Sequence, residues 1–303
     1  MSFAQDVKKE LCALPFGKNS AALAECYGIL LFANIFRGDE IRIITQSGEF
    51  AARIVELFFR SFGITVEPKS AGEGSRFVFS IIDQMQLYSV FEALGIDPDT
   101  SGTKLSSALL KGQENRGAFL RGAFLSGGSL ADPNVRYHLE FCTPFLGFSG
   151  AMSLFFEQLK LTPRVTTRAG KYVIYFKSSE SIADIITMAG AHRAALEIIQ
   201  AKVVKQVRNG VNRYVNCETA NISRTVSAAQ VQTQAIEKLQ SSGKLDVLPP
   251  ALRETALIRL ENPEASLSAL GEMLSPPVNR ATLNYRLKKL LELASAEEGK
   301  DEA

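Results

Sequence analysis

Apolar residues in the first 190 positions follow a pattern that recurs about 95 residues further on. Three blocks repeat in the same order, and their pairs are ELFFRSFGI (56–64) with SLFFEQLKL (153–161), YGILLFANIF (27–36) with RGAFLSGGSL (121–130), and SRFVFSI (75–81) with KYVIYFK (171–177). The alternative explanation is coincidence between common apolar patterns, but such a match would have to occur three times in the same order. The pattern therefore predicts an internal duplication.

Each repeat predicts the elements αβαββα. An apolar helix comes first, at 21–36 and again at 115–129, and a polar turn follows it (RGDE at 37–40, ADPN at 131–134). Then come a strand, an amphipathic helix, two strands with a turn between them, and a closing helix. A glycine inside a helix costs about 1 kcal/mol unless a close approach offsets it. Gly28 and Gly122 therefore predict that the two apolar helices pack together about a pseudo-twofold axis.

The last third of the chain has helical periodicity. It predicts a helix over 191–208 that stops at Asn209-Gly210, and a second helix over 219–240. A helix with proline at its entrance then ends at Asn262-Pro263. A short helix (266–274), a tight turn (275–279) and a basic amphipathic helix (280–294) complete a helix-turn-helix.

Four segments follow from this division. We expect a duplicated α+β domain over 1–190, a linker helix and basic loop over 191–217, an all-α helix-turn-helix domain over 218–294, and an acidic tail over 295–303.

Basic residues gather in the C-terminal part of the chain. The whole chain has a net charge of +2, while residues 196–294 carry 13 Lys/Arg and 9 Asp/Glu. No acid occurs from 279 to 291, which favours a DNA-binding helix over an ordinary bundle helix with a charged face. The candidate DNA-binding residues are Arg280, Ala281, Thr282, Asn284, Tyr285, Arg286, Lys288 and Lys289.

The first five of these candidates, Arg280 to Tyr285, belong to the N-terminal turns, where a recognition helix approaches base edges. The last three, from Arg286 on, are expected to meet phosphates. The linker adds candidate phosphate contacts, unless it is only a solvated connector, at Lys202, Lys205, Arg208 and Arg213.

Composition narrows the chemistry further. No apolar run is long enough to span a membrane, and the first residues show no apolar segment with a cleavage pattern, so we expect neither a membrane span nor secretion. The four cysteines have no metal-ligand spacing, so they are expected to be buried or free thiols. His138 and His192 lack a second ligand at a useful spacing, and Asp39 and Asp132 sit in turns that favour aspartate. We therefore expect no metal, no cofactor and no membrane partner.

The repeat resembles the LAGLIDADG homing endonuclease fold, in which two seam helices carry the name-giving motif. LRGAFLSGG (120–128) aligns with the motif letter by letter, and CYGILLFAN (26–34) is a fainter first copy. The resemblance places the metal-binding acid of that family at Gly127 and Ala33, and neither residue can bind Mg²⁺. We therefore expect the scaffold without catalytic residues, and no enzyme.

The order of the parts is similar to the WhiA family of bacterial DNA-binding regulators. The segments that carry the resemblance are RNGVNRYVNCETAN (208–221) and LPPALRETALIRLENPEASLSALGEMLSPPV (248–278). It implies a cytoplasmic, nucleoid-associated transcription regulator linked to cell division, chromosome segregation or sporulation, with double-stranded DNA as its partner. The N-terminal domain would bind a protein partner or mediate self-association. Two alternatives remain: a metal-dependent endonuclease of LAGLIDADG type, and a protein-interaction scaffold with incidental DNA binding.

Overall fold

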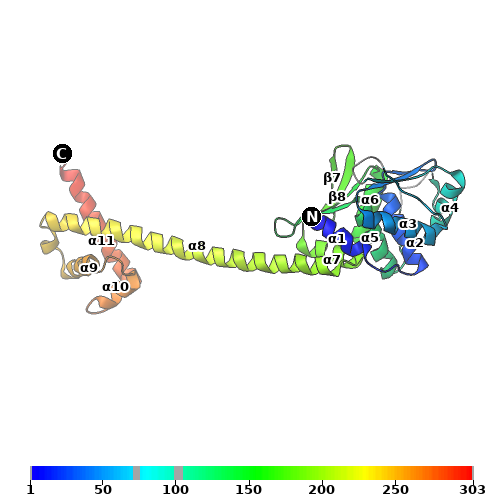
Figure 1. The fold of residues 1–303 in the computed structure, drawn as a ribbon. Coiled ribbons are helices and arrows are strands. Elements are labelled where there is room, and N and C mark those ends of the chain that lie inside the picture. The colour runs from blue at the N-terminus through cyan, green and yellow to red at the C-terminus, as the bar shows by residue number, and fades with distance from the viewer. Residues whose placement is uncertain (1, 71–75, 99–104, 302–303) are drawn as a thin grey trace. The chain divides into compact units, whose positions relative to one another are not determined.

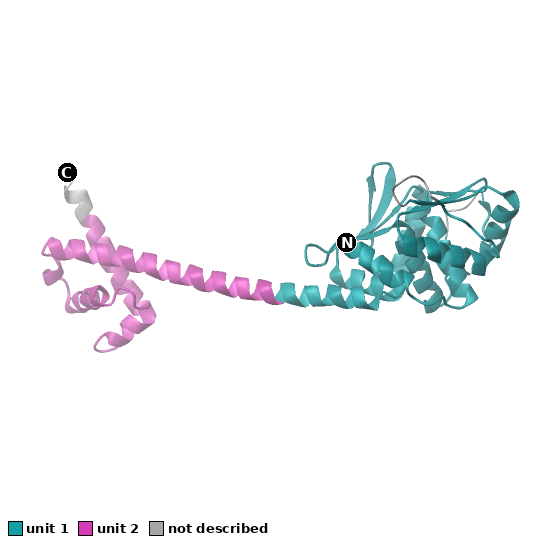
Figure 2. Cartoon of the chain, in the orientation of Figure 1, with its two compact units in different colours: residues 1–206 teal, residues 207–303 magenta. Residues whose placement is uncertain are grey.

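The computed structural model describes residues 2–70, 76–98 and 105–301. The chain divides into two compact units, Met1–Gln206 and Val207–Ala303, which Figure 2 distinguishes by colour. Within the described residues, no helix is both long and apolar enough to cross a membrane.

Unit 1 contains two copies of one arrangement (Figure 1). A helix that neither copy includes, α1, precedes them and spans Phe3–Cys12. The first copy comprises α2 (Asn19–Leu31), β1 (Ile35–Phe36), β2 (Ile41–Thr45), α3 (Gly48–Phe62), β3 (Lys69–Ser70), β4 (Phe77–Ile81) and α4 (Gln84–Leu94). The second comprises α5 (Gln113–Gly127), β5 (Gly128–Leu130), β6 (Leu139–Thr143), α6 (Leu146–Gln158), β7 (Arg164–Arg168), β8 (Lys171–Phe176) and α7 (Ser179–Ala189).

The two sheets have the same topology. Their strand orders are β1-β2-β4-β3 and β5-β6-β8-β7, and each neighbouring pair is antiparallel. Inward positions alternate with outward ones, as in β2, where Ile41 and Ile43 are buried and Arg42 and Ile44 are exposed. The predicted duplication and the α+β class are confirmed.

The predicted repeat lacked one strand. Each copy reads αββαββα, because the apolar helix ends early and its last residues form a short strand, β1 or β5, which hairpins onto the next strand. The expected helices 21–36 and 115–129 were therefore too long at their C-terminal ends. In the first copy, the first of the two later strands is expected from the sequence at TVEPK (65–69). This position was also wrong, since β3 begins only at Lys69.

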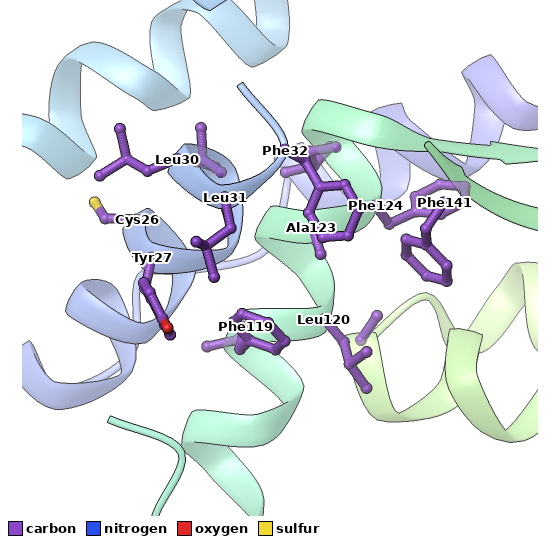
Figure 3. Close-up of a cluster of buried hydrophobic side chains, with 14 of the residues drawn as sticks. Cys26, Tyr27, Leu30, Leu31, Phe32, Phe119, Leu120, Ala123, Phe124 and Phe141 are labelled. Atoms are coloured by element: carbon purple, nitrogen blue, oxygen red, sulfur yellow. The ribbon is translucent and has the colours of Figure 1, made fainter. Parts of the chain in front are cut away.

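The apolar helices α2 and α5 pack directly against each other, as predicted. A Cβ atom on Gly28 would collide with the carbonyl oxygen of Phe119, and one on Gly122 would collide with the carbonyl oxygen of Glu25. Figure 3 shows the large side chains around this seam, with Tyr27 and Phe119 from opposite helices. Their rings lie 5.6 Å apart between centroids. The two glycines let the helix backbones approach, and the apolar side chains fill the space beside them.

A buried ion network flanks the seam. Glu25 on α2 is 1% exposed, and its carboxylate accepts hydrogen bonds from Arg53 Nε at 2.6 Å and from Arg121 Nε at 2.9 Å. Arg53 also donates to the carbonyls of Cys12 and Leu14. The network ties α1, α3 and α5 to α2, and removal of Glu25 would leave the buried Arg53 guanidinium without a counter-charge.

Helix α8 spans His192–Ser241, 50 residues without a break. The expected stop at Asn209-Gly210 was wrong, and so was the basic loop after it. Both residues are exposed and helical, and a Cβ on Gly210 would meet no atom within 4 Å. The helix-breaking tendency of Asn-Gly costs only about 1 kcal/mol, which the continuous hydrogen bonding on both sides outweighs.

Unit 2 is all helical. The last turns of α8 pack with α9 (Pro250–Glu261), α10 (Leu267–Met273) and α11 (Arg280–Asp301). The core residues they share are Ile236, Leu239, Leu245, Ala256, Leu270, Leu274, Leu283, Leu287, Leu290 and Ala294. Helix α11 continues into the expected acidic tail, beyond the predicted end at 294.

Candidate nucleic-acid interface

Helices α10 and α11 are joined by a tight, capped turn. Ser266 Oγ accepts the backbone N–H of Ala269 at the start of α10, and Asn279 Oδ1 accepts the backbone N–H of Thr282 at 2.8 Å at the start of α11. Between them, the Val278 N–H donates to the Gly271 carbonyl at 2.9 Å. These bonds hold the first turn of α11 in a defined position beside α10, which is the geometry of a helix-turn-helix.

Helix α11 has a buried side and an outward side. Leu283, Leu287 and Leu290 are each 1% exposed and face the core of unit 2. The outward side carries five candidates from the sequence, all exposed: Ala281, Thr282, Tyr285, Lys288 and Lys289. Lys289 pairs with Glu292 at 3.3 Å, three residues along the same helix. The outward side therefore combines small and aromatic groups near the N-terminus with lysines further on.

The other three candidates lie on the flanks of α11. Arg286 is half-buried, and its Nη1 lies 3.5 Å from the carbonyl of Ala251 and from Thr255 Oγ1 on α9. Arg280 and Asn284 lie on the opposite flank and line a pocket that also includes residues of α8. The sequence placed all eight candidates on one helix, and the structure divides them between three directions.

The four linker candidates differ from one another. Lys202 pairs with Glu180, and the hydrogen bond from Lys202 is the main reason that the pKa of Glu180 is lowered to about 2. Lys205 Nζ donates to the Pro133 carbonyl at 2.7 Å and lies 4.6 Å from the ring centre of Tyr137. Both lysines are thus engaged within unit 1.

Arg208 and Arg213, the other two linker candidates, are exposed on α8. Arg213 was expected in a basic loop after Asn209-Gly210, and that segment is helical. Their side chains therefore project from a helix surface.

The seam bottom, where the C-terminal ends of α2 and α5 meet, does not fit a metal ion. Gly127 and Ala33 stand where the resemblance places metal-binding acids, and neither has a ligand atom. A Cβ on Gly127 would already collide with the Phe32 side chain, whose ring packs 5.0 Å from that of Phe148. Figure 3 shows Phe32 near Phe124 and Phe141 at this end of the seam. An apolar cluster therefore fills the space that metal chemistry would need.

Three of the four remaining candidate ligands have local partners. Asp39 lies 3.4 Å from Arg37 in its turn, and Asp132 Oδ1 accepts the Asn134 N–H at 2.8 Å. His138 Nε2 lies 3.2 Å from Glu140 Oε2. His192 is exposed at the start of α8. Across the described ranges, no group of three His, Cys, Asp or Glu side chains is placed to hold a metal.

Sequence reasoning missed a buried arginine of the site. Arg259 on α9 is 1% exposed and lines the pocket shared by Arg280 and Asn284. In the sequence it stands within an ordinary amphipathic helix, and only its place at a buried position of the helical pattern sets it apart.

The fold and the interface define a two-part class of protein: a duplicated LAGLIDADG-like domain with a glycine seam, followed by a helix-turn-helix domain. The chain belongs to the WhiA family. Residues 116–208 match the model of the WhiA LAGLIDADG-like domain, and residues 211–294 match that of the WhiA C-terminal HTH domain.

Full-length relatives support this assignment. The chain is 34% identical to a probable cell division protein WhiA of Ruminiclostridium cellulolyticum, over 97% of both chains. It is 35% identical to the protein of the same name from Heliobacterium modesticaldum, over 98% of this chain and 97% of the relative. The crystal structure of full-length DUF199/WhiA from Thermatoga maritima has the same fold, with a TM-score of 0.61, 24% identity, and 98% and 99% of the two chains covered.

Proposed function

We propose that this chain is a transcription regulator that binds duplex DNA through α11. The observation that carries the proposal is the outward side of α11, which is exposed, basic and free of acids from 279 to 291, on a helix whose first turn is fixed by the Asn279 cap. A helix of this kind enters the major groove with its N-terminal residues toward the bases. The relatives are named as probable cell division proteins, so we extend the proposal to a regulator linked to cell division.

The side chains on α11 divide between two kinds of contact. Ala281, Thr282 and Tyr285 are closest to the N-terminus on the outward side, so we assign them to base edges, where a methyl group can contact the thymine methyl and a hydroxyl group can donate or accept a hydrogen bond. Lys288 and Lys289 lie two turns further on, so we assign them to phosphates. Arg286 supports the helix through α9.

Two residues expected to read bases, Arg280 and Asn284, flank the core side of the helix. A contact to the DNA backbone suits that position better than one to a base edge.

The LAGLIDADG-like domain is proposed to be catalytically inactive. Hydrolysis by such a fold needs acids that hold metal ions at the seam bottom, and Gly127, Ala33 and the phenylalanine cluster take their place. This apolar seam bottom weighs against the metal-dependent endonuclease. We propose instead that the domain contributes protein contacts or self-association, while the chain acts at the nucleoid.

Selection from a random duplex library tests the DNA-binding proposal. The full chain is expected to enrich one motif. The variant Thr282→Ala/Tyr285→Ala should retain its fold by circular dichroism and enrich a relaxed motif, while Lys288→Ala should enrich the same motif with weaker binding. Failure of the wild-type chain to enrich any sequence would contradict sequence-specific regulation and favour the scaffold with incidental DNA binding.

A cleavage assay tests the inactive domain. Supercoiled plasmid incubated with the full chain and Mg²⁺ or Mn²⁺ should remain intact. Metal-dependent nicking that disappears in Asp39→Asn or Asp132→Asn would instead support an endonuclease, with acids from the turns in place of the seam acids.

A further inference from the structure

Unit 2 contains a polar pocket of about 520 Å³ beside the first turn of α11. It is formed by α8, the end of α9, the start of α10 and α11. Its lining has no aspartate or glutamate and three arginines, and consists of Asn221, Arg224, Thr225, Ala228, Gln232, Arg259, Ser266, Leu267, Ser268, Arg280 and Asn284. The charged side chains of the pocket are therefore all positive.

Arg259 is the unusual member of this set. The residue is 1% exposed, and its guanidinium bonds only neutral acceptors: Nε donates to Gln232 Oε1 at 2.9 Å, and Nη1 donates to the Ala265 carbonyl at 2.8 Å and lies 3.5 Å from the Asn262 carbonyl. No carboxylate in the described part of unit 2 comes within ion-pair distance of it. Burial lowers the pKa of Arg259. A buried charge without a counter-ion is costly, so this position favours a site that receives a negative charge from outside the chain.

Arg224 on α8 and Arg280 on α11 line the same pocket, and both side chains are exposed. Neither takes part in an ion pair with any described residue. Arginine suits this arrangement because its planar fork donates two parallel hydrogen bonds to phosphate oxygens. Asn221, Ser268 and Asn284 add neutral polar groups from three helices. The pocket thus has the charge and the donors that a phosphate group requires.

We propose that this pocket binds a phosphate group, with Arg224 and Arg280 as its direct contacts and Arg259 as the buried charge behind them. The position beside the first turn of α11 favours a phosphodiester of bound DNA as the source, and this choice of source rests on the proposed function. A phosphate of a free small molecule has the same chemistry. Two measurements on the full chain separate the two sources.

The first measurement is calorimetric titration of the full chain with inorganic pyrophosphate at constant ionic strength. The test variants are Arg224→Gln and Arg280→Gln. The matched control is Arg253→Gln, which removes an equal charge from α9 outside the pocket, where Arg253 pairs with Asp246 at 2.8 Å on the surface. Pyrophosphate should bind, and each test variant should weaken it about tenfold, whereas the control should leave it within about twofold.

The second measurement is the salt dependence of duplex DNA binding by the same four proteins. Each test variant should lower the slope of log K against log salt by about 0.9, and the control should leave the slope unchanged. A change in slope supports a DNA phosphodiester in the pocket. Pyrophosphate binding that depends on Arg224, without a change in slope, supports a free phosphorylated ligand.

The proposal is overturned if pyrophosphate does not bind and the test variants have the same DNA slope as Arg253→Gln. That result would leave DNA binding through the outward side of α11 intact. Conversely, a wild-type chain that binds no DNA would refute the proposed function. The pyrophosphate titration alone would then show whether the pocket binds a phosphate group. Melting curves of all four proteins verify that the substitutions do not unfold unit 2.

Discussion

The α2–α5 seam depends on single residues that lack a side chain. Gly28 and Gly122 meet the opposite helix backbone at equivalent places, each against a carbonyl oxygen about one turn before the other glycine. Added carbon atoms would push rigid backbones apart, and a packed core cannot absorb such a shift through side-chain rotation. The sequence predicted these contacts because glycine weakens an apolar helix unless a second helix comes close to it.

Gly122→Ala should destabilise unit 1 by about 2 kcal/mol or more, since the new methyl group overpacks the seam. Gly150→Ala in α6 is the matched control, because a Cβ there meets no atom within 4 Å. The control should be neutral or stabilising by up to about 1 kcal/mol, through helix propensity. Urea unfolding of both variants measures the difference, and equal effects would contradict a close seam.

The buried thiol of Cys26 gives a pH-dependent prediction. Burial raises its pKa from 9.0 to about 12. The folded state therefore keeps this proton over a range where the unfolded state loses it, so the thiol's contribution to stability is present below pH 9 and falls as pH rises toward 12.

Cys26→Ala should accordingly lose less stability than the wild type as the pH rises from about 9 to about 11, whatever its stability at neutral pH. Cys217→Ala is the control, because it removes an exposed thiol instead of a buried one. Urea unfolding at stepped pH values provides the measurement. Parallel profiles for all three proteins would refute a raised pKa at Cys26.

At the scale of elements, the sequence predicted the long periodic helices and strands. It missed the very short strands, and it divided one long helix into two. Strands β1 and β5 span two and three residues, too few for an alternating pattern, and only their pairing with β2 and β6 defines them. For α8 the sequence predicted a break that is not there. Asn209-Gly210 is typical of a helix end, but both residues are helical within α8.

Gly210→Ala tests the continuity of α8. Alanine in an exposed helix interior should stabilise the helix by about 1 kcal/mol and slow amide exchange around residue 210. Gly243→Ala is the contrasting variant, because Gly243 follows α8 with a φ of 70°, where alanine is strained. It should destabilise unit 2. A loss of protection in Gly210→Ala would indicate a turn at that position.

The candidate interface was predictable only where it lies on one helix. The outward residues of α11 follow from helical periodicity and from the acid-free run. The phosphate pocket could not be predicted, because Arg224, Arg259 and Arg280 come from three helices whose packing depends on contacts far apart in the sequence. Nor does periodicity show that Lys202 and Lys205 are already bound within unit 1.

At the scale of the whole molecule, net charge does not separate the two units. Residues 1–206 hold 22 basic and 20 acidic residues, and residues 207–303 hold 12 of each, four of the acids lying in the tail 295–303. DNA affinity depends on neutralised phosphates, so it is the local acid-free run from 279 to 291 that favours α11 as the DNA-binding element. Exposed basic residues still occur on the sheets of unit 1, among them Arg164 on β7 and Lys171 on β8.

The most direct test compares the salt dependence of duplex DNA binding for two full-length double variants. Lys288→Gln/Lys289→Gln removes two charges from α11, and Arg164→Gln/Lys171→Gln removes two from the second sheet of unit 1, which contains β7 and β8. We expect the α11 variant to lose affinity for all sequences and its slope to fall by about two units, while the sheet variant matches the wild type. A sheet variant that loses slope while the α11 variant keeps it would contradict DNA binding through α11 and make the LAGLIDADG-like domain the DNA-binding part.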